Sequence, residues 1–142
     1  MSRVLVIDDE ADVRLLYRVN LRHAGHEVLE ADDGERGIEA AREHRPDAVV
    51  LDLMMPRVDG FEVLRVLRAE KASCEVPVLV LTADSRVDDH RICFELGADE
   101  VITKPFMPEA LTEGIARLLT TSPEDRLARR QEAAAAAGSA FG

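Results

Sequence analysis

Carboxylates follow two apolar runs of this chain, and they are the residues best suited to chemistry. Asp8 and Asp9 come directly after Val4 to Ile7, and Asp52 comes directly after Ala48 to Leu51. Carboxylates held close together raise one another's pKa, and a bound cation relieves that repulsion. Carboxylate oxygens are hard ligands of the kind that Mg²⁺ takes, usually alongside waters and a phosphate oxygen. These three residues therefore predict a magnesium site.

Two further polar residues follow apolar runs later in the chain. Thr82 ends the run from Val76 to Leu81, and Lys104 follows a shorter run that includes Val101. A lysine ammonium and a threonine hydroxyl are the donors that the oxygens of a transferring phosphoryl group need. The nucleophile can then be a plain carboxylate, which gives an aspartyl phosphate. One aspartate after a strand more often opens a turn, but the set together favours phosphoryl transfer to Asp52.

The apolar runs have the length and pattern of strands buried on both faces of a parallel sheet. Between them, apolar residues recur at helical spacing, as in the segment from Ala11 to Ala24, which ends before Gly25. Five strand segments alternate with five helical segments. The expected strands cover residues 4–7, 27–31, 48–51, 76–81 and 101–102, and the expected helices include residues 35–45 and 86–96.

This alternation predicts a doubly wound α/β fold with a five-stranded parallel sheet, because parallel neighbours need long right-handed crossovers that helices supply. Among such folds we choose the flavodoxin-like strand order 2-1-3-4-5, which periodicity alone does not fix. It places the first and third strands side by side at the switch point where ligands bind. Under this order five polar residues converge at one edge of the sheet: Asp8, Asp9, Asp52, Thr82 and Lys104.

The composition fits one acidic domain. The chain has 142 residues, and 28 acidic against 18 basic residues give a formal net charge of -10. Such a chain repels phosphate backbones, so we expect no direct contact with nucleic acid. No signal-peptide core or membrane-spanning run is visible, and we expect a cytoplasmic protein that does not enter the membrane. Cys74 and Cys93 lack metal-ligand spacing and are expected to be reduced thiols.

Residues 122–142 differ in character from the domain expected over residues 1–121. Ser122 and Pro123 suit a helix start, but the segment has one apolar residue before a run of alanines. We expect a frayed, solvated helix or a disordered tail. Arg126, Arg129 and Arg130 would share one face of such a helix, and a solvated face is favoured over a docking surface.

Five separated motifs, in order, resemble the receiver domains of response regulators in two-component signalling, which have the chemotaxis-regulator fold. The resemblance covers about residues 3–120. The motifs are Val6 to Glu10, Val50 to Pro56 with Asp59 and Gly60, Leu81 to Ala83, Gly97 to Asp99, and Lys104 to Phe106.

The resemblance implies that Asp52 accepts a phosphoryl group from the phosphohistidine of a sensor histidine kinase or phosphotransfer protein. It further implies that Asp9, Asp52 and the backbone carbonyl of Met54 hold Mg²⁺, with Asp8 acting through water. Thr82 and Lys104 would contact the phosphoryl group. The chain would then be a phosphoacceptor that catalyses its own phosphorylation and dephosphorylation, and no enzyme in the ordinary sense.

The resemblance places the output on the fourth helix, fifth strand and fifth helix, about residues 86–120, where a downstream protein target or a phosphorylation-dependent homodimer would form. Nothing in the sequence resembles a DNA-binding module, which favours a single-domain regulator. The alternative is the receiver part of a longer regulator with an output domain beyond residue 142.

The chain departs from the family at Val101, where an aromatic residue is usual. We expect phosphorylation to be intact and the aromatic half of the switch to be missing or carried by another residue. Met54 and Asp84 occupy positions at which the family tunes the dephosphorylation rate, and the Lys104–Pro105 bond resembles the family's cis peptide.

Two other classes use similar parts. A phosphatase of the haloacid-dehalogenase type places its nucleophile after the first strand in an Asp-x-Asp pattern, whereas Asp8 is followed two residues later by Glu10. A flavodoxin-like electron carrier needs a hydroxyl- and glycine-rich phosphate loop there and aromatic residues for the flavin, and only 4% of this chain is aromatic. Modification of Asp8 would favour the phosphatase, and a colourless protein would exclude the electron carrier.

Overall fold

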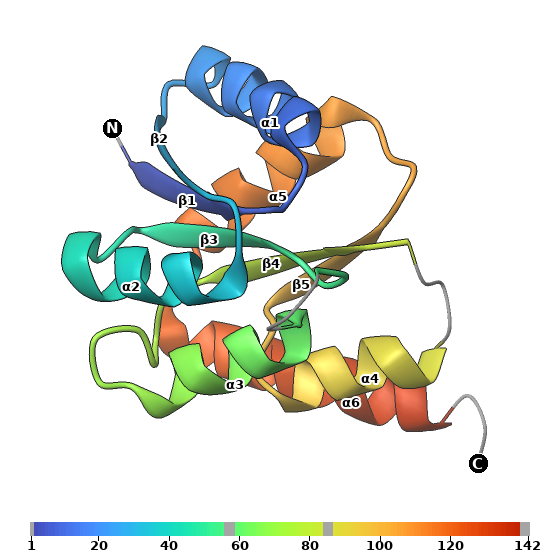
Figure 1. Ribbon diagram of the computed structural model, residues 1–142. Helices are drawn as coiled ribbons and strands as arrows, with labels where there is room; N and C mark the ends of the chain where they lie inside the picture. The colour runs from blue at the N-terminus through green and yellow to red at the C-terminus, as the bar shows by residue number, and fades with distance from the viewer. Residues whose placement is uncertain (1, 56–58, 84–86, 140–142) are drawn as a thin grey trace.

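The computed structural model describes residues 2–55, 59–83 and 87–139, and within the last of these segments it does not describe the side chains of residues 87, 88 and 137–139. Strands and helices alternate along the chain before a final helix (Figure 1). The strands are β1 (Arg3–Ile7), β2 (Glu27–Ala31), β3 (Ala48–Asp52), β4 (Val78–Thr82) and β5 (Glu100–Thr103). The helices are α1 (Ala11–His23), α2 (Gly34–His44), α3 (Gly60–Ala69), α4 (Val87–Glu95), α5 (Pro108–Leu119) and α6 (Pro123–Ser139).

The five strands form one parallel sheet in the order β2-β1-β3-β4-β5, which confirms the expected doubly wound α/β fold and its strand order. The register aligns Ile7 of β1 with Leu51 of β3, and Asp52 of β3 with Leu81 of β4. The carboxyl ends of these three strands therefore lie at one edge. The residues that follow them emerge together.

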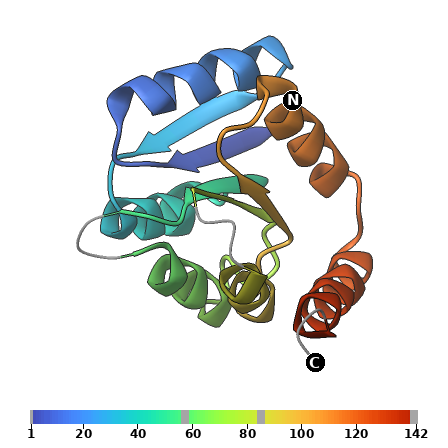
Figure 2. The same cartoon turned by 90° about the vertical axis from the view of Figure 1, so that its right-hand side faces the viewer.

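Helices cover both faces of the sheet, and each face has its own apolar core (Figures 1 and 2). Val4 and Val6 point to the side of α1 and α5, where they join Tyr17 and Leu21. The alternate residues of β1 point to the side of α2, α3 and α4, because side chains alternate between the faces of a strand. Every residue of β3 and β4 is buried, as their unbroken apolar pattern predicts.

The start of α3 is tied to the strand that carries Asp52. The side chain of Asp59 caps the helix by accepting a hydrogen bond from the Glu62 N–H. The N–H of Gly60 donates to the carbonyl of Leu53 at 2.9 Å, and a Cβ at Gly60 would lie 2.5 Å from the Leu53 Cα. Only glycine permits this approach, which fixes the backbone directly after Asp52.

The observed boundaries differ from the expected ones by one or two residues in several places. Strand β4 begins at Val78, not at residue 76, and it includes Thr82. Pro77 has no N–H to donate to a neighbouring strand, which explains the late start. The expected helix start at residue 86 lies outside the described residues. Cys74 and Cys93 are free thiols.

The C-terminal helix α6 is the main departure from expectation, because it packs against α4 (Figure 2). Arg126 is only 7% exposed, and both Arg126 and Arg130 approach the carboxylate of Asp99. Arg129, by contrast, is exposed. The expected solvated face is therefore wrong for Arg126 and Arg130, whose partner precedes them by about 30 residues and leaves no periodic signal.

Among the helices of the described segments, none has both the length and the apolar character needed to cross a membrane.

Candidate functional site

Three carboxylates meet at the carboxyl edge of the sheet. Ligand oxygens of Asp8, Asp9 and Asp52 all lie within 4.8 Å of one another. Asp8 and Asp52 are buried, and Asp9 is exposed. They come together because β1 and β3 are parallel neighbours in register. The structure thus brings together the three acids that the sequence singled out.

Asp8 is the most strongly perturbed of these acids. Its Oδ1 accepts a hydrogen bond from the Glu10 N–H at 2.9 Å, but its buried Oδ2 has no hydrogen-bond partner among the described residues. Burial raises the pKa of Asp8 to about 6, and the charge of Asp52 adds to the shift, whereas the Glu10 hydrogen bond opposes it. An orphan carboxylate oxygen beside two other acids fits a hard divalent cation.

Asp52 lies at the centre of the site. Its Oδ1 accepts a hydrogen bond from the Met54 N–H at 3.2 Å and lies 3.6 Å from the Nζ of Lys104. Burial raises the pKa of Asp52, and the positive charge of Lys104 is the largest opposing influence. A buried carboxylate beside one ammonium can accept a phosphoryl group whose added negative charge the ammonium would share.

Thr82 and Lys104 lie at the same edge as the acids. Thr82 is the last residue of β4 and is fully buried, one position beyond the partner of Asp52. The backbone N–H of Lys104 donates to the Thr82 carbonyl at 2.7 Å, which joins the ends of β4 and β5. The Lys104–Pro105 bond is cis, as expected.

Three further positions singled out from the sequence lie near the ends of β3, β4 and β5 in the chain. Met54 lies two residues beyond Asp52 with an exposed side chain, and the role of its carbonyl stays a prediction. Val101 pairs with Val80 in the sheet and is partly buried, three residues before Lys104. Asp84 lies outside the described residues.

Residues of α1 line one side of the site, and the sequence alone did not single them out. The Arg14 guanidinium donates to the backbone carbonyl of Asp8 at 2.7 Å, and Tyr17 stacks on Phe106 with ring centroids 6.0 Å apart. Burial raises the pKa of the Tyr17 hydroxyl, and the charge of Asp8 adds to the shift. Tyr17 lies in the apolar stripe of its helix, so its pattern indicated only a core residue.

Known proteins with similar sequences and structures have this same architecture. The family model described as the response regulator receiver domain matches residues 4–116. The strand order and the acidic cluster at the carboxyl edge of the sheet are those expected of a doubly wound receiver domain. The chain belongs to the response regulator receiver family.

Curated relatives are longer than this chain. The DNA-binding dual master transcriptional regulator RpaA of Synechocystis is 41% identical over 119 residues, which are 84% of this chain and 49% of RpaA. The alkaline phosphatase synthesis transcriptional regulatory protein PhoP of Bacillus subtilis is 39% identical over 85% of this chain and 50% of its own. The chain therefore spans about half the length of these relatives.

Solved structures of similar size have the same fold. The chemotaxis protein CheY4 of Vibrio cholerae is 31% identical with a TM-score of 0.79, over 83% of this chain and 98% of its own. The receiver domain of a sensor histidine kinase of Pseudomonas aeruginosa is 27% identical with a TM-score of 0.78, over 84% of this chain and 98% of its own. That structure has a magnesium ion coordinated in its active site cleft.

Proposed function

We propose that this chain is a phosphorylation-dependent signalling switch whose phosphoacceptor is Asp52. The observation that carries the proposal is the burial of Asp52 between an acidic cluster and the Lys104 ammonium, 3.6 Å away. The donor is a phosphohistidine of a sensor histidine kinase or phosphotransfer protein. The P–N bond breaks as a P–O bond forms to a carboxylate oxygen of Asp52, and the leaving imidazole takes up a proton. Water later hydrolyses the acyl phosphate and restores the carboxylate.

We infer a Mg²⁺ site formed by Asp9, Asp52 and the backbone carbonyl of Met54, with Asp8 acting through water. The orphan Oδ2 of Asp8 and the spacing of the acids support this ligand set. When bound, Mg²⁺ supplies positive charge that offsets the negative charge of the phosphoryl oxygens. Lys104 pairs with one phosphoryl oxygen, and the Thr82 hydroxyl donates a hydrogen bond to another.

Intact mass with peptide mapping tests this function, after incubation with Mg²⁺ and a small acyl phosphate. We expect one added phosphate on Asp52, absent from Asp52→Asn and from a sample with chelator. Asp12→Asn is the matched control, because Asp12 is an exposed aspartate of the neighbouring helix. A phosphate on Asp8 would favour the phosphatase class, and no adduct with any of the proteins would contradict the proposal.

We propose that output passes through α4, β5 and α5 to a downstream protein or a second copy of the chain. A single-domain regulator would act through this face alone. The curated relatives support the alternative, a receiver that controls an output domain elsewhere in a longer chain, because they are about twice as long and are named as transcriptional regulators. In that case the output domain contacts DNA, and this acidic receiver does not.

A further inference from the structure

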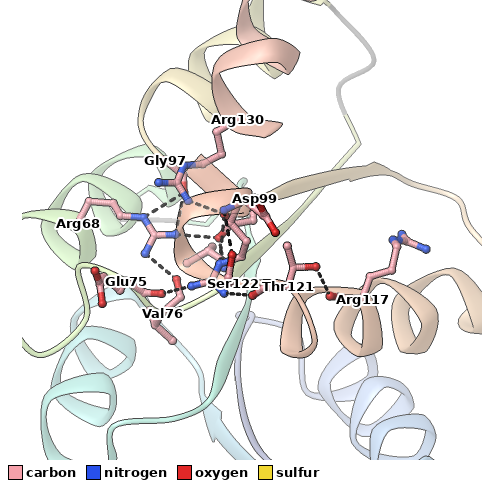
Figure 3. A network of polar contacts seen from close by, with 12 residues as sticks. Arg68, Glu75, Val76, Gly97, Asp99, Arg117, Thr121, Ser122 and Arg130 are labelled. Atoms are coloured by element: carbon pink, nitrogen blue, oxygen red, sulfur yellow. Dashed lines mark hydrogen bonds and ion pairs between the residues drawn. The ribbon is translucent and has the colours of Figure 1, made fainter. Parts of the chain in front are cut away.

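Asp99 is a buried anchor for three arginines from two helices (Figure 3). Its side chain is 1% exposed, and its Oδ2 accepts hydrogen bonds from the Val78 N–H at 2.9 Å and from Arg68 of α3 at 3.0 Å. Its Oδ1 lies 2.5 Å from the Nη1 of Arg130 and 3.7 Å from the Nε of Arg126. Both of these arginines belong to α6, so the Asp99 carboxylate joins α6 to α3 and to the start of β4.

The cluster carries more positive than negative charge. Three guanidiniums face one carboxylate, and backbone carbonyls accept further hydrogen bonds from Arg68 and Arg126. Arg126, for example, donates to the Thr121 carbonyl at 2.6 Å and to the Glu75 carbonyl at 2.5 Å. Burial lowers the pKa of Arg68 to about 10, and the charges of Arg130 and Arg126 add to that shift while Asp99 opposes it. Docking of α6 therefore brings attraction to Asp99 together with repulsion from Arg68.

Few side chains of α6 are buried, although the helix packs against α4: among its described side chains only that of Arg126 is buried. Leu127 is 48% exposed, and six of the twelve residues that follow it in α6 are alanines. A groove of about 500 Å³ runs between α4 and α6, lined in part by Phe94, Leu96 and Ala134. A helix held by a polar anchor and few buried apolar side chains belongs to the elements that open at low free energy.

The α4 helix connects this anchor to the phosphoacceptor site. On its inner side, the Nε2 of His90 lies 3.4 Å from the Oγ1 of Thr103. Thr103 pairs with Thr82 in the sheet and directly precedes Lys104. The same α4 helix packs against α6. A shift of α4 at the ends of β4 and β5 would therefore alter its packing against α6.

We propose that α6 is an intramolecular latch on the α4 face, and that its docking and the phosphorylation of Asp52 oppose each other. The latch rests on the function proposed above. Because coupling between two sites is reciprocal, release of α6 favours the phosphorylated form, and phosphorylation favours release of α6. A partner that binds the outer face of α4 would displace α6 by the same competition.

Hydrogen exchange of α6 amides tests the docking. Arg130→Gln removes the contact to Asp99 but leaves Arg68 and Arg126 beside that carboxylate. Arg129→Gln removes the same charge from an exposed position of the same helix. We expect exchange over residues 123–136 to rise roughly tenfold in Arg130→Gln, as for the loss of one partly buried charged contact, and to change less than about twofold in Arg129→Gln. Equal exchange in the two variants would overturn the latch.

The coupling is tested by repeating the exchange after incubation with Mg²⁺ and a small acyl phosphate, with the phosphorylated fraction measured by mass. We expect faster exchange of the α6 amides in the phosphorylated wild type than in the unmodified wild type. We also expect the ratio of phosphorylated to unmodified protein to be about fivefold higher for Arg130→Gln than for the wild type. Unchanged exchange in a phosphorylated wild type would overturn the coupling. If no variant takes up phosphate, the proposed function and the coupling both fail, while the difference between Arg130→Gln and Arg129→Gln still decides the docking.

Discussion

Asp8 is a buried carboxylate whose ionisation costs free energy in the folded state. Its pKa is raised to about 6 by burial, so the folded chain binds this proton more tightly than the unfolded chain does, where the pKa is near 3.8. By linkage, this contribution makes the folded state more stable as the pH falls from about 6 toward 3.8, and less stable above pH 6. A buried group of this kind is a common device of functional sites.

Replacement of Asp8 by asparagine removes the cost of burying an ionised carboxylate beside other acids. We expect Asp8→Asn to raise the free energy of unfolding by about 1–3 kcal/mol at pH 7.5 in the presence of chelator. The gain should shrink as the pH approaches 4, because the wild-type carboxyl is then protonated. Urea unfolding at both pH values measures it, with Asp12→Asn as the control for loss of a surface charge. A variant that is less stable than wild type at pH 7.5 would contradict this account of Asp8.

Lys104 is the cation beside Asp52. We expect Lys104→Gln to slow phosphorylation by a small acyl phosphate about 10- to 100-fold, because the ammonium no longer shares the charge of the phosphoryl oxygens. The initial rate of adduct formation by mass measures this effect. Lys71→Gln is the control, since Lys71 is exposed and follows α3. Equal rates in the two variants would remove Lys104 from the reaction.

At the scale of elements, the entry into α3 holds the backbone that follows Asp52. A Cβ at Gly60 would lie 2.5 Å from the Leu53 Cα, whereas the atoms nearest to a Cβ at Gly37 of α2 would be side-chain atoms of Ile7. The Leu53 backbone cannot rotate away from an added Cβ, whereas the Ile7 side chain can change its rotamer.

We therefore expect Gly60→Ala to destabilise the fold by about 2–3 kcal/mol and to cost at least about 1 kcal/mol more than Gly37→Ala. Alanine also gains helix propensity at both positions, so that gain cancels in the comparison. Thermal and urea unfolding of the two variants measure the difference. A smaller loss at Gly60 than at Gly37 would show that the α3 entry is adaptable.

The positions of strands and helices also decide which parts of the site could be predicted from the sequence. Asp8, Asp9, Asp52 and Lys104 lie at or directly beyond the ends of strands. The carboxyl ends of parallel strands meet at one edge of a sheet, so local patterns predicted this cluster once a strand order was chosen. The contact of Arg130 with Asp99 spans 31 positions and depends on how α6 lies on α4. No periodicity encodes it, and a charged helix face reads as solvated when its partner is unknown.

At the scale of the whole molecule, a formal net charge of -10 disfavours the compact state through self-repulsion, and any added salt weakens that repulsion. The stabilisation by a specifically bound ion must therefore be distinguished from the stabilisation by ionic strength alone. We expect Mg²⁺ at about 100 times its Kd to add about 2.7 kcal/mol of stability, which raises Tm by about 5–10 °C for a chain of this length. The reference is NaCl at matched ionic strength.

The acidic cluster determines how this stabilisation should vary. Asp9→Asn and Asp52→Asn each remove a proposed ligand, so their Tm should respond to Mg²⁺ no more than to matched NaCl. Asp12→Asn should keep the full response, since Asp12 is exposed on α1. In the wild type the response should weaken below about pH 6, because Asp8 binds a proton that competes with the cation. A response that is the same in all four proteins would mean that Mg²⁺ only screens the negative surface, and the metal site would have to be abandoned.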